Sequence, residues 1–320
     1  MAMELIGAAG MTAELKQTYD RMLLTRALPA LVHANWGVKK NVPARGGKSI
    51  EFRKMEAISA STTALTEGTP PAVTNATFST VAVTISQYGQ YAQITDLLDT
   101  QAFDPVVAEY VENFGEAMGD SLDQVVRDII VAGTTIQYAS TAATRTGASG
   151  VGSGMYINSA EIREAISTLK RNNAKPVADG KYVCVLHPDN SRDLFSDANI
   201  VNAFSYAAPR SDANPLFTGV LGDYMGVRFV ETTNLKIQSS LGLSGADVYM
   251  VLFVGKEAYC VTELDAMQAR TIIHPRGSGG HTDPLEQYST VGWKAALAAK
   301  ILNNNFMVRL ECNASRTTAA

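Results

Sequence analysis

Residues 104–133 carry the most regular pattern in the chain, DPVVAEYVENFGEAMGDSLDQVVRDIIVAG. Large apolar residues recur in it at intervals of three and four, the period of an amphipathic helix: Val107, Val111, Phe114, Met118, Leu122, Val125 and Ile129. Asp104 suits a helix N-cap, Pro105 suits the first helical position, and Gly133 favours a helix end. The pattern predicts a helix over 105–132, about 42 Å long.

The opposite side of this predicted helix is acidic. Its charged residues, spaced three or four apart, are Glu109, Glu112, Glu116, Asp120 and Asp123. Such a stripe is typical of the solvated face of a helix whose apolar face meets a core. We therefore expect these carboxylates to face water.

Two strands precede the helix. In 49–53, Ile50 and Phe52 alternate with charged residues, and 78–85 alternates in the same way. The connection between them, residues 56–77, is rich in Thr, Ser, Ala and Pro. Loops this long are usually functional or disordered, and a lone two-stranded ribbon is marginal in water. The pattern predicts that a surface of another molecule supports this ribbon.

The remaining elements favour a mixed architecture. We expect helices over 12–28 and from Asn158 to Arg171, where Asn158 and Glu161 resemble a capping box. Strands are expected over 181–186, 226–231 and 248–254, with more strand-like sequence from 288 to 312. These strands come in clusters without a regular βαβ rhythm, so the fold class is α+β.

Composition narrows the function classes. The chain has 320 residues and a formal net charge of −4, so no cationic surplus supports a dedicated DNA-reading protein.

Its three cysteines, Cys184, Cys260 and Cys312, are widely spaced and form no C-x-x-C motif. We expect reduced thiols and a cytoplasmic site of synthesis. The longest apolar run, 248–254, is too short for a membrane span, and the N-terminus lacks a signal-peptide pattern.

Motifs for chemistry are weak. The glycine-rich run 147–154 lacks the Lys-Ser/Thr of a phosphate loop, so we expect a flexible surface loop. His187 could serve as a general base, but no partner for it can be named. Four residues of metal-ligating types lie close in sequence without matching a known spacing: His274, His281, Asp283 and Glu286. We assign no catalytic, cofactor-binding or metal-binding residue.

Several short strings resemble a known family. They are LPALVHANWGVKK at 28–40, GGKSIEFRK at 46–54, LTEGTPP at 65–71, QYGQYAQITD at 87–96 and VGWK at 291–294. Together they resemble the major capsid proteins of tailed bacteriophages, which have the Hong Kong 97-type fold. The resemblance implies an N-terminal arm (1–47), an extended β-hairpin loop (48–96) and a peripheral domain with a spine helix (97–175). It further implies an axial domain (176–270) and a return of the chain to the peripheral domain (271–320).

The resemblance also implies a function. Family members assemble into hexamers and pentamers of an icosahedral head around double-stranded DNA, and the extended loop of one subunit lies over its neighbour's peripheral domain. A separate scaffolding protein is expected, because no long scaffolding segment precedes the arm. Portal and decoration proteins are further expected partners, DNA contact is expected to be non-specific, and no membrane is involved. The chain would be made and assembled in the bacterial host cytoplasm and would reside in the virion.

Two alternatives stay open. An encapsulin-like cellular nanocompartment shell shares the fold but encloses cargo proteins. A metal-dependent enzyme using His274, His281 and Asp283 would belong to a different class.

Overall fold

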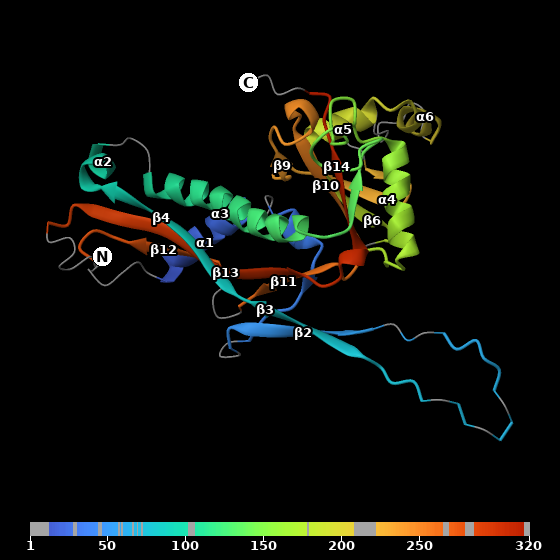
Figure 1. The fold of residues 1–320 in the computed structure, drawn as a ribbon. Coiled ribbons are helices and arrows are strands. Elements are labelled where there is room, and N and C mark those ends of the chain that lie inside the picture. The colour runs from blue at the N-terminus through green and yellow to red at the C-terminus, as the bar shows by residue number, and fades with distance from the viewer. Residues whose placement is uncertain are drawn as a thin grey trace.

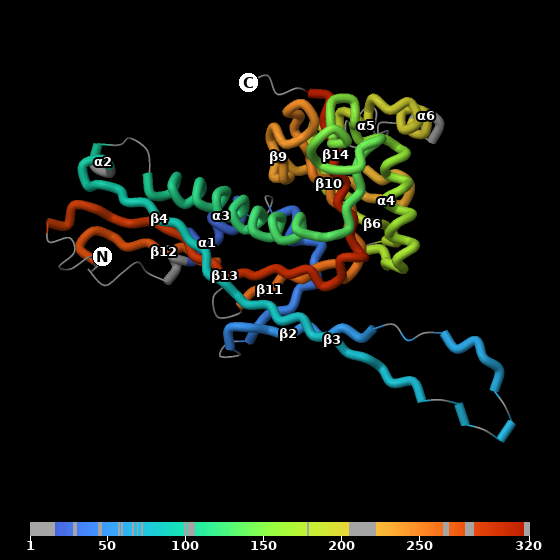
Figure 2. The backbone as a smooth tube through the Cα atoms, viewed as in Figure 1, coloured from blue at the N-terminus to red at the C-terminus, as the bar shows by residue number. Residues whose placement is uncertain are grey.

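The computed structural model describes residues 13–27, 31–43, 47–101, 106–207, 222–264, 269–278 and 285–316, except positions 57, 59, 66, 69, 72 and 178. It has an elongated lower body with a helix-covered sheet, an upper body with a second sheet, and a ribbon that leaves the lower body (Figure 1). The backbone trace shows that the ribbon extends well beyond both bodies (Figure 2).

The long strand β13 (Tyr288–Ile301) organises the lower body, a five-stranded sheet. Strand β4 (Ser86–Thr95) pairs antiparallel with one of its edges. On the other edge, β12 (Arg270–His274) and β11 (Tyr259–Glu263) pair with successive parts of β13, and β1 (Val38–Lys39) adds parallel to β11. Side chains of a strand alternate between faces, so odd-numbered residues of β13 such as Val291 join the main core. Even-numbered Ala296 and Ala298 face the other side.

Two helices cover the core-side face of this sheet. The predicted long helix is confirmed as α3 (Val106–Val131), and the predicted N-terminal helix is α1 (Ala13–Ala27), which lies against α3 (Figure 1). The apolar stripe of α3 is buried at Val111, Phe114, Met118, Leu122, Val126 and Ile130. The sequence periodicity identified the correct helix and four buried residues of its stripe. The predicted Val107, Val125 and Ile129 are only partly buried, and Val126 and Ile130 continue the buried stripe instead.

Gly115 allows the two helices to approach closely. A Cβ atom at this position would lie 2.7 Å from the backbone oxygen of Leu23 in α1. Because that neighbour is backbone, it cannot rotate away as a side chain would. Any larger residue at 115 must push α1 from α3.

We expect Gly115→Ala to destabilise the subunit by about 1–3 kcal/mol through this overpacking, despite the better helix propensity of alanine. The midpoint of urea unfolding should fall. Asn113→Ala, an exposed site on the same helix, is the control and should leave the midpoint unchanged or raise it. Equal midpoints for Gly115→Ala and the wild type would contradict a tight α1–α3 contact.

The ribbon is formed by β2 (Ser49–Met55) and β3 (Phe78–Thr84), which pair antiparallel from Ser49 opposite Thr84 to Met55 opposite Phe78. Both predicted strands are confirmed. After β3 the chain continues through Ile85 directly into β4, so one nearly uninterrupted strand joins the ribbon to the five-stranded sheet (Figure 1).

The upper body is a seven-stranded sheet in the order β5-β14-β10-β6-β8-β7, with β9 also paired to β10. Its strands are β5 (Ile136–Tyr138), β6 (Tyr182–Leu186), β7 (Asp223–Tyr224), β8 (Val227–Glu231), β9 (Ile237–Gln238), β10 (Val248–Val254) and β14 (Met307–Cys312). Every residue of β6 and β10 is buried. Helices α4 (Ser159–Arg171), α5 (Pro188–Phe195) and α6 (Ala198–Ala207) complete this body (Figure 1).

The described residues also include the short helix α2 (Asp96–Gln101) and the 3₁₀ turns η2 (His33–Asn35), η3 (Leu243–Gly245) and η6 (Asn304–Phe306). The predicted capping box at α4 is only half formed. Asn158 caps the helix by accepting hydrogen bonds from the amides of Ala160 and Glu161. The Glu161 carboxylate instead accepts from the Ser140 amide and the Gln137 side chain, which ties α4 to β5.

Strand pairing divides the chain differently from the predicted ranges 97–175, 176–270 and 271–320. Strands β5 and β14 lie outside 176–270 but belong to the same sheet as β6 and β10. Strand β11 lies inside that range but pairs with β13 in the lower body. The physical reason is that the chain crosses between the bodies three times in the described residues, and hydrophobic alternation does not identify a strand's partner.

Candidate assembly surfaces and the joint between the sheets

The ribbon exposes apolar side chains far from the core. Five of them have exposed fractions between 52% and 85%: Met55, Ile58, Leu65, Val73 and Phe78. Scattered exposed apolar residues are normal, but a group on one projecting segment indicates a surface for interaction.

The base of the ribbon is firmly attached. Phe52, Val83 and Ile85 form a small buried cluster with Ala296 and Ala298 on the outer face of the sheet. The Lys300 ammonium donates a hydrogen bond to the Ala82 carbonyl at 3.1 Å. The described loop beyond the strands is almost entirely exposed. The ribbon is therefore anchored at one end only.

A groove of about 530 Å³ lies on the same sheet, lined by residues of β4, β12 and β13. Gly292 and Gly89 let the strands approach: a Cβ at Gly292 would lie 2.8 Å from the Gln90 carbonyl oxygen, and one at Gly89 would lie 2.7 Å from the Trp293 carbonyl oxygen. Tyr91 and Ile272 supply apolar lining, and Lys294 supplies a positive charge.

A second exposed apolar group lies at the end of the sheet remote from the ribbon. Leu97 and Leu98 on α2 are exposed, as are Tyr91 on β4 and Leu285 just before β13. The Asp96 amide donates to the Gln287 carbonyl, which holds the start of α2 beside the start of β13.

A buried polar cluster joins the segment after α1 to the spine helix and β11. The carboxylate of Asp123 accepts a hydrogen bond from the His33 amide at 2.7 Å, and its other oxygen lies 2.7 Å from His33 Nδ1. The Tyr259 hydroxyl donates to the His33 carbonyl. Burial, together with the nearby Asp123 charge, raises the pKa of Tyr259 well above its ordinary range.

The expectation of a wholly solvated acidic face is therefore wrong at Asp123, which is 0% exposed. The chain turns back at His33 and presents an amide and an imidazole to this carboxylate. The other acidic residues of the stripe are less buried. Glu112 and Glu116 form exposed ion pairs with Arg26 of α1 at 2.9 and 3.0 Å.

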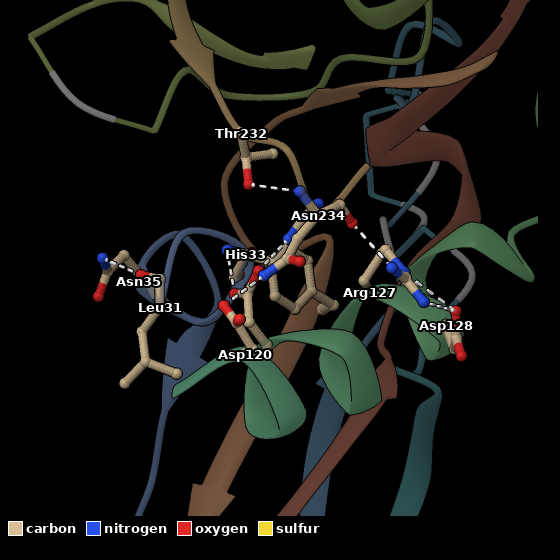
Figure 3. Close-up of polar contacts among 10 residues, drawn as sticks. Leu31, His33, Asn35, Asp120, Arg127, Asp128, Thr232 and Asn234 are labelled. Atoms are coloured by element: carbon tan, nitrogen blue, oxygen red, sulfur yellow. Dashed lines mark hydrogen bonds and ion pairs between the residues drawn. The ribbon is translucent and has the colours of Figure 1, made fainter. Parts of the chain in front are cut away.

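The loop between β8 and β9 reaches the spine helix near its end (Figure 3). The Asn234 side chain donates to Asp120 Oδ1 at 3.0 Å, and Arg127 donates to the Asn234 carbonyl at 2.9 Å. Lys236 lies 3.3 Å from Asp128. Partial burial raises the pKa of Asp128, but the hydrogen bonds and charges of Arg127 and Lys236 outweigh it and hold this pKa below its ordinary value.

A second ionic cluster lies within the upper body. Glu311 of β14 is fully buried and accepts from Arg145 Nε at 2.8 Å. Arg309 lies 2.9 Å from the same carboxylate and donates to the carbonyl of Val131, the last residue of α3. The hydrogen bond from Arg145 to Glu311 raises the pKa of Arg145, whereas burial lowers the pKa of Arg309.

A sequence profile described as "Phage capsid protein" matches residues 76–307, more than half of the chain. The chain belongs to the phage capsid protein family. This confirms the resemblance drawn from the sequence strings, and the role of the family is structural. No curated protein matches the chain.

Solved capsid structures share the fold of this capsid protein. It is similar to the capsid protein of cyanophage Pam1, with a TM-score of 0.69, 17% identity and coverage of 99% of this chain and 97% of that one. The capsid of cyanophage P-SCSP1u gives a TM-score of 0.66 at 16% identity, with 89% of each chain covered. A virus-like particle from Pyrococcus furiosus gives 0.52 at 12% identity, covering 93% of this chain and all of that one (100%). The α+β, Hong Kong 97-type fold is confirmed.

The candidate metal ligands of this capsid protein are only partly described. His274 ends β12 and lines the groove, and Glu286 lies beside Gly277. His281 and Asp283 lie outside the described residues. Within the described ranges, no three His, Cys, Asp or Glu side chains are grouped to hold a metal ion. Likewise, no described helix is long and apolar enough to span a bilayer.

His187 has a structural position. It is the N-cap of α5, where its ring accepts a hydrogen bond from the Asp189 amide at 3.2 Å, and it lies beside the Tyr249 ring.

The glycine-rich run 147–154 is not a flexible surface loop along its whole length. Val151 is fully buried and its carbonyl accepts a hydrogen bond from the Leu243 amide at 2.8 Å, and a Cβ atom at Gly152 would lie 3.2 Å from the side chain of Leu243.

All three cysteines of the capsid protein are free and buried. Burial raises the pKa of Cys184, Cys260 and Cys312 and thus disfavours the reactive thiolate. We expect no rapid reaction of the native protein with a thiol-specific reagent such as Ellman's reagent, and reaction of all three thiols after denaturation. A disulfide ladder on non-reducing gels, lost on reduction, would contradict this expectation.

Proposed function

We propose that this chain is the major head protein of a tailed phage and forms hexamers and pentamers of an icosahedral shell around double-stranded DNA. The observation that carries the proposal is the ribbon, which is anchored at its base and exposes apolar side chains along its length. Its own chain does not cover these side chains, so a second copy is the natural partner. Identical chains with such contacts close into symmetric assemblies.

The groove on the five-stranded sheet is the proposed receptor for the neighbouring ribbon. In Figure 1 the ribbon extends away from the end of the lower body that carries α2, β4 and β12, so its own tip does not approach its own groove. Charge also fits this pairing. The loop 56–77 contains two acidic residues, Glu56 and Glu67, and no Lys or Arg, while the groove presents Lys294. Leu65 and Val73 supply apolar side chains for Tyr91 and Ile272.

Other features of the proposal rest on the family. A separate scaffolding protein, a portal and possible decoration proteins complete the particle, which is assembled in the host cytoplasm. DNA contact is non-specific, in keeping with a net charge of −4. The chain carries out no catalytic reaction in this proposal.

Electron microscopy of the purified protein, with its scaffolding partner when needed, tests the shell. We expect closed particles that contain DNA when recovered from virions. Particles filled with a protein cargo would favour the encapsulin-like alternative. A monomer as the only species in virion-derived material would overturn the proposal.

A charge swap tests the ribbon and groove. Lys294→Glu should oppose Glu67 of the neighbouring copy and raise the critical concentration for assembly at least about fivefold, equivalent to about 1 kcal/mol per contact. Combining it with Glu67→Lys should restore assembly. Arg192→Glu, an exposed site on α5 outside the groove, is the control and should assemble normally. If the double variant did not recover normal assembly, the neighbouring ribbon would have to bind at a surface other than this groove.

A further inference from the structure

The connections between the two bodies converge at one place. Residues 131–136 join α3 to β5, residues 254–259 join β10 to β11, and residues 301–307 join β13 to β14. Hydrogen bonds link these connections: Gly255 N to Phe306 O at 2.8 Å, Leu302 N to Ala258 O at 2.9 Å, and Thr134 N to Asn304 Oδ1 at 3.2 Å. Such a bundle of short connections is where two bodies can rotate relative to each other.

A second contact between the bodies runs along α3 from Asp128, close to this bundle, to Asp120, farther from it. The loop between β8 and β9 touches α3 from Asp120 to Asp128 through Asn234 and Lys236. This stretch is about 12 Å of helix, and it begins about 16 Å before the helix ends at Val131. Because the Asn234–Asp120 end of this contact is far from the connecting segments, even a small rotation about those segments would change its bond distances.

The chemistry of this contact suits it to fixing a position. Leu235 is 3% exposed and joins the main apolar core, which includes residues of both bodies, so the loop is anchored where the bodies meet. Apolar burial is non-directional, whereas hydrogen bonds depend on distance and angle. The bonds of Asn234 to Asp120 and of Arg127 to Asn234 therefore define where along the helix the loop sits (Figure 3).

We propose that Asn234, Arg127 and Asp120 form an angular stop: they hold the two sheets at one angle about the connections 131–136, 254–259 and 301–307. Without the stop, the subunit populates a range of angles. The inference concerns a single chain and stands independently of the proposed shell. In a shell, the angle would influence curvature, and loss of the stop would broaden the distribution of particle diameters.

The test measures the angle through an intramolecular distance. Glu109→Cys on α3 and Arg192→Cys on α5 place spin labels on exposed sites of the two bodies, and the native cysteines are buried. Labelled chains are diluted into an excess of unlabelled chains, so that only intramolecular distances are recorded. The wild-type background should give one narrow distance distribution.

The decisive variants exchange an amide and a carboxylate. Asn234→Asp places a second carboxylate against Asp120, and we expect a broadened or shifted distribution. Asn234→Asp combined with Asp120→Asn restores an amide–carboxylate pair with reversed roles and should restore the narrow distribution. Arg26→Met breaks ion pairs to the same helix within the lower body alone and should leave the distribution unchanged.

Three results would overturn the proposal: a wild-type distribution in Asn234→Asp, failure of the double variant to recover, or equal broadening in Arg26→Met. If Asn234→Asp fails to fold, judged by circular dichroism, Arg127→Met provides the second variant. It removes the hydrogen bond to the Asn234 carbonyl without adding a charge, and the same broadening is expected. A narrow wild-type distribution in Arg127→Met would then count against the stop. If no shell forms with any variant, the proposed function fails while the distance distributions still decide this inference.

Discussion

A chain lacking residues 56–77 is expected to fold normally and to form no stable shells. The deletion can be closed with Asn-Gly between Met55 and Phe78, which lie opposite each other in the ribbon and suit a two-residue turn. The described loop residues are nearly all exposed, so their removal costs the subunit's core little. Phe52, Val83 and Ile85 keep their contacts with the sheet.

The deletion should weaken assembly strongly, because every subunit of the shell loses the same contact with its neighbour. Burial of about 300 Å² of apolar surface by a neighbouring copy contributes about 7 kcal/mol before association costs. Circular dichroism and the melting temperature should match the wild type, while sedimentation and electron microscopy show only subunits or small oligomers. Both proteins are prepared with the same scaffolding partner.

A full-length variant separates loop length from apolar burial. Ile58→Ser, Leu65→Ser and Val73→Ser together keep the loop but remove its large exposed apolar side chains. We expect assembly to be weakened strongly in this variant too. Normal particles from the deletion would refute the bridging role of the loop, and an unfolded deletion variant would show that the segment belongs to the subunit's own core.

Asp123→Ala should cause the largest loss of subunit stability among the single substitutions considered. The change leaves the His33 amide and imidazole buried without the carboxylate that now meets both groups. Each buried group left without its hydrogen-bond partner typically costs about 1–3 kcal/mol, so the loss should total about 2–6 kcal/mol. For a chain of this size, the melting temperature should fall by about 10 °C.

Two neighbours provide the comparison. Asp120→Ala, one turn earlier on the exposed side of α3, should lower the melting temperature by only a few degrees. Asp123→Asn keeps an oxygen that can accept a hydrogen bond from the His33 amide. Its melting temperature should lie between those of Asp123→Ala and Asp120→Ala. Thermal unfolding followed by circular dichroism measures all three variants. A change at Asp123→Ala no larger than that at Asp120→Ala would show that the buried cluster contributes little.

Local sequence patterns predicted the individual helices and strands, but they did not predict which distant segments pair with each other. The helix over 106–131 and the strands of the ribbon follow from spacings of three to four and of two, which each segment carries by itself. The exact match at β10 (Val248–Val254) has the same origin. The resemblance of short strings added the fold family, which periodicity alone could not identify.

The polar sites could not be found in this way. Asp123 fits the acidic stripe of its helix, and nothing in the local sequence shows that His33, ninety residues earlier, turns back to meet it. The same holds for Asn234 with Asp120 and for Glu311 with Arg145. Each pair depends on how separate segments pack together. Gly89 and Gly292 carry no local signal of a shared role, because only the register of β4 against β13 places them together at the groove.

The uninterrupted path from β3 into β4 has a mechanical consequence. A pulling force on the ribbon is transmitted along the backbone into β4. This strand, which pairs with β13 at ten positions, runs along the direction of that force. Hydrogen bonds of an antiparallel ladder stand perpendicular to the strands, so such a load shears many of them at once instead of opening them one by one. Tension carried by the ribbon is thereby spread over the longest strand ladder in the described chain, so the loop can bear load without opening the sheet one hydrogen bond at a time.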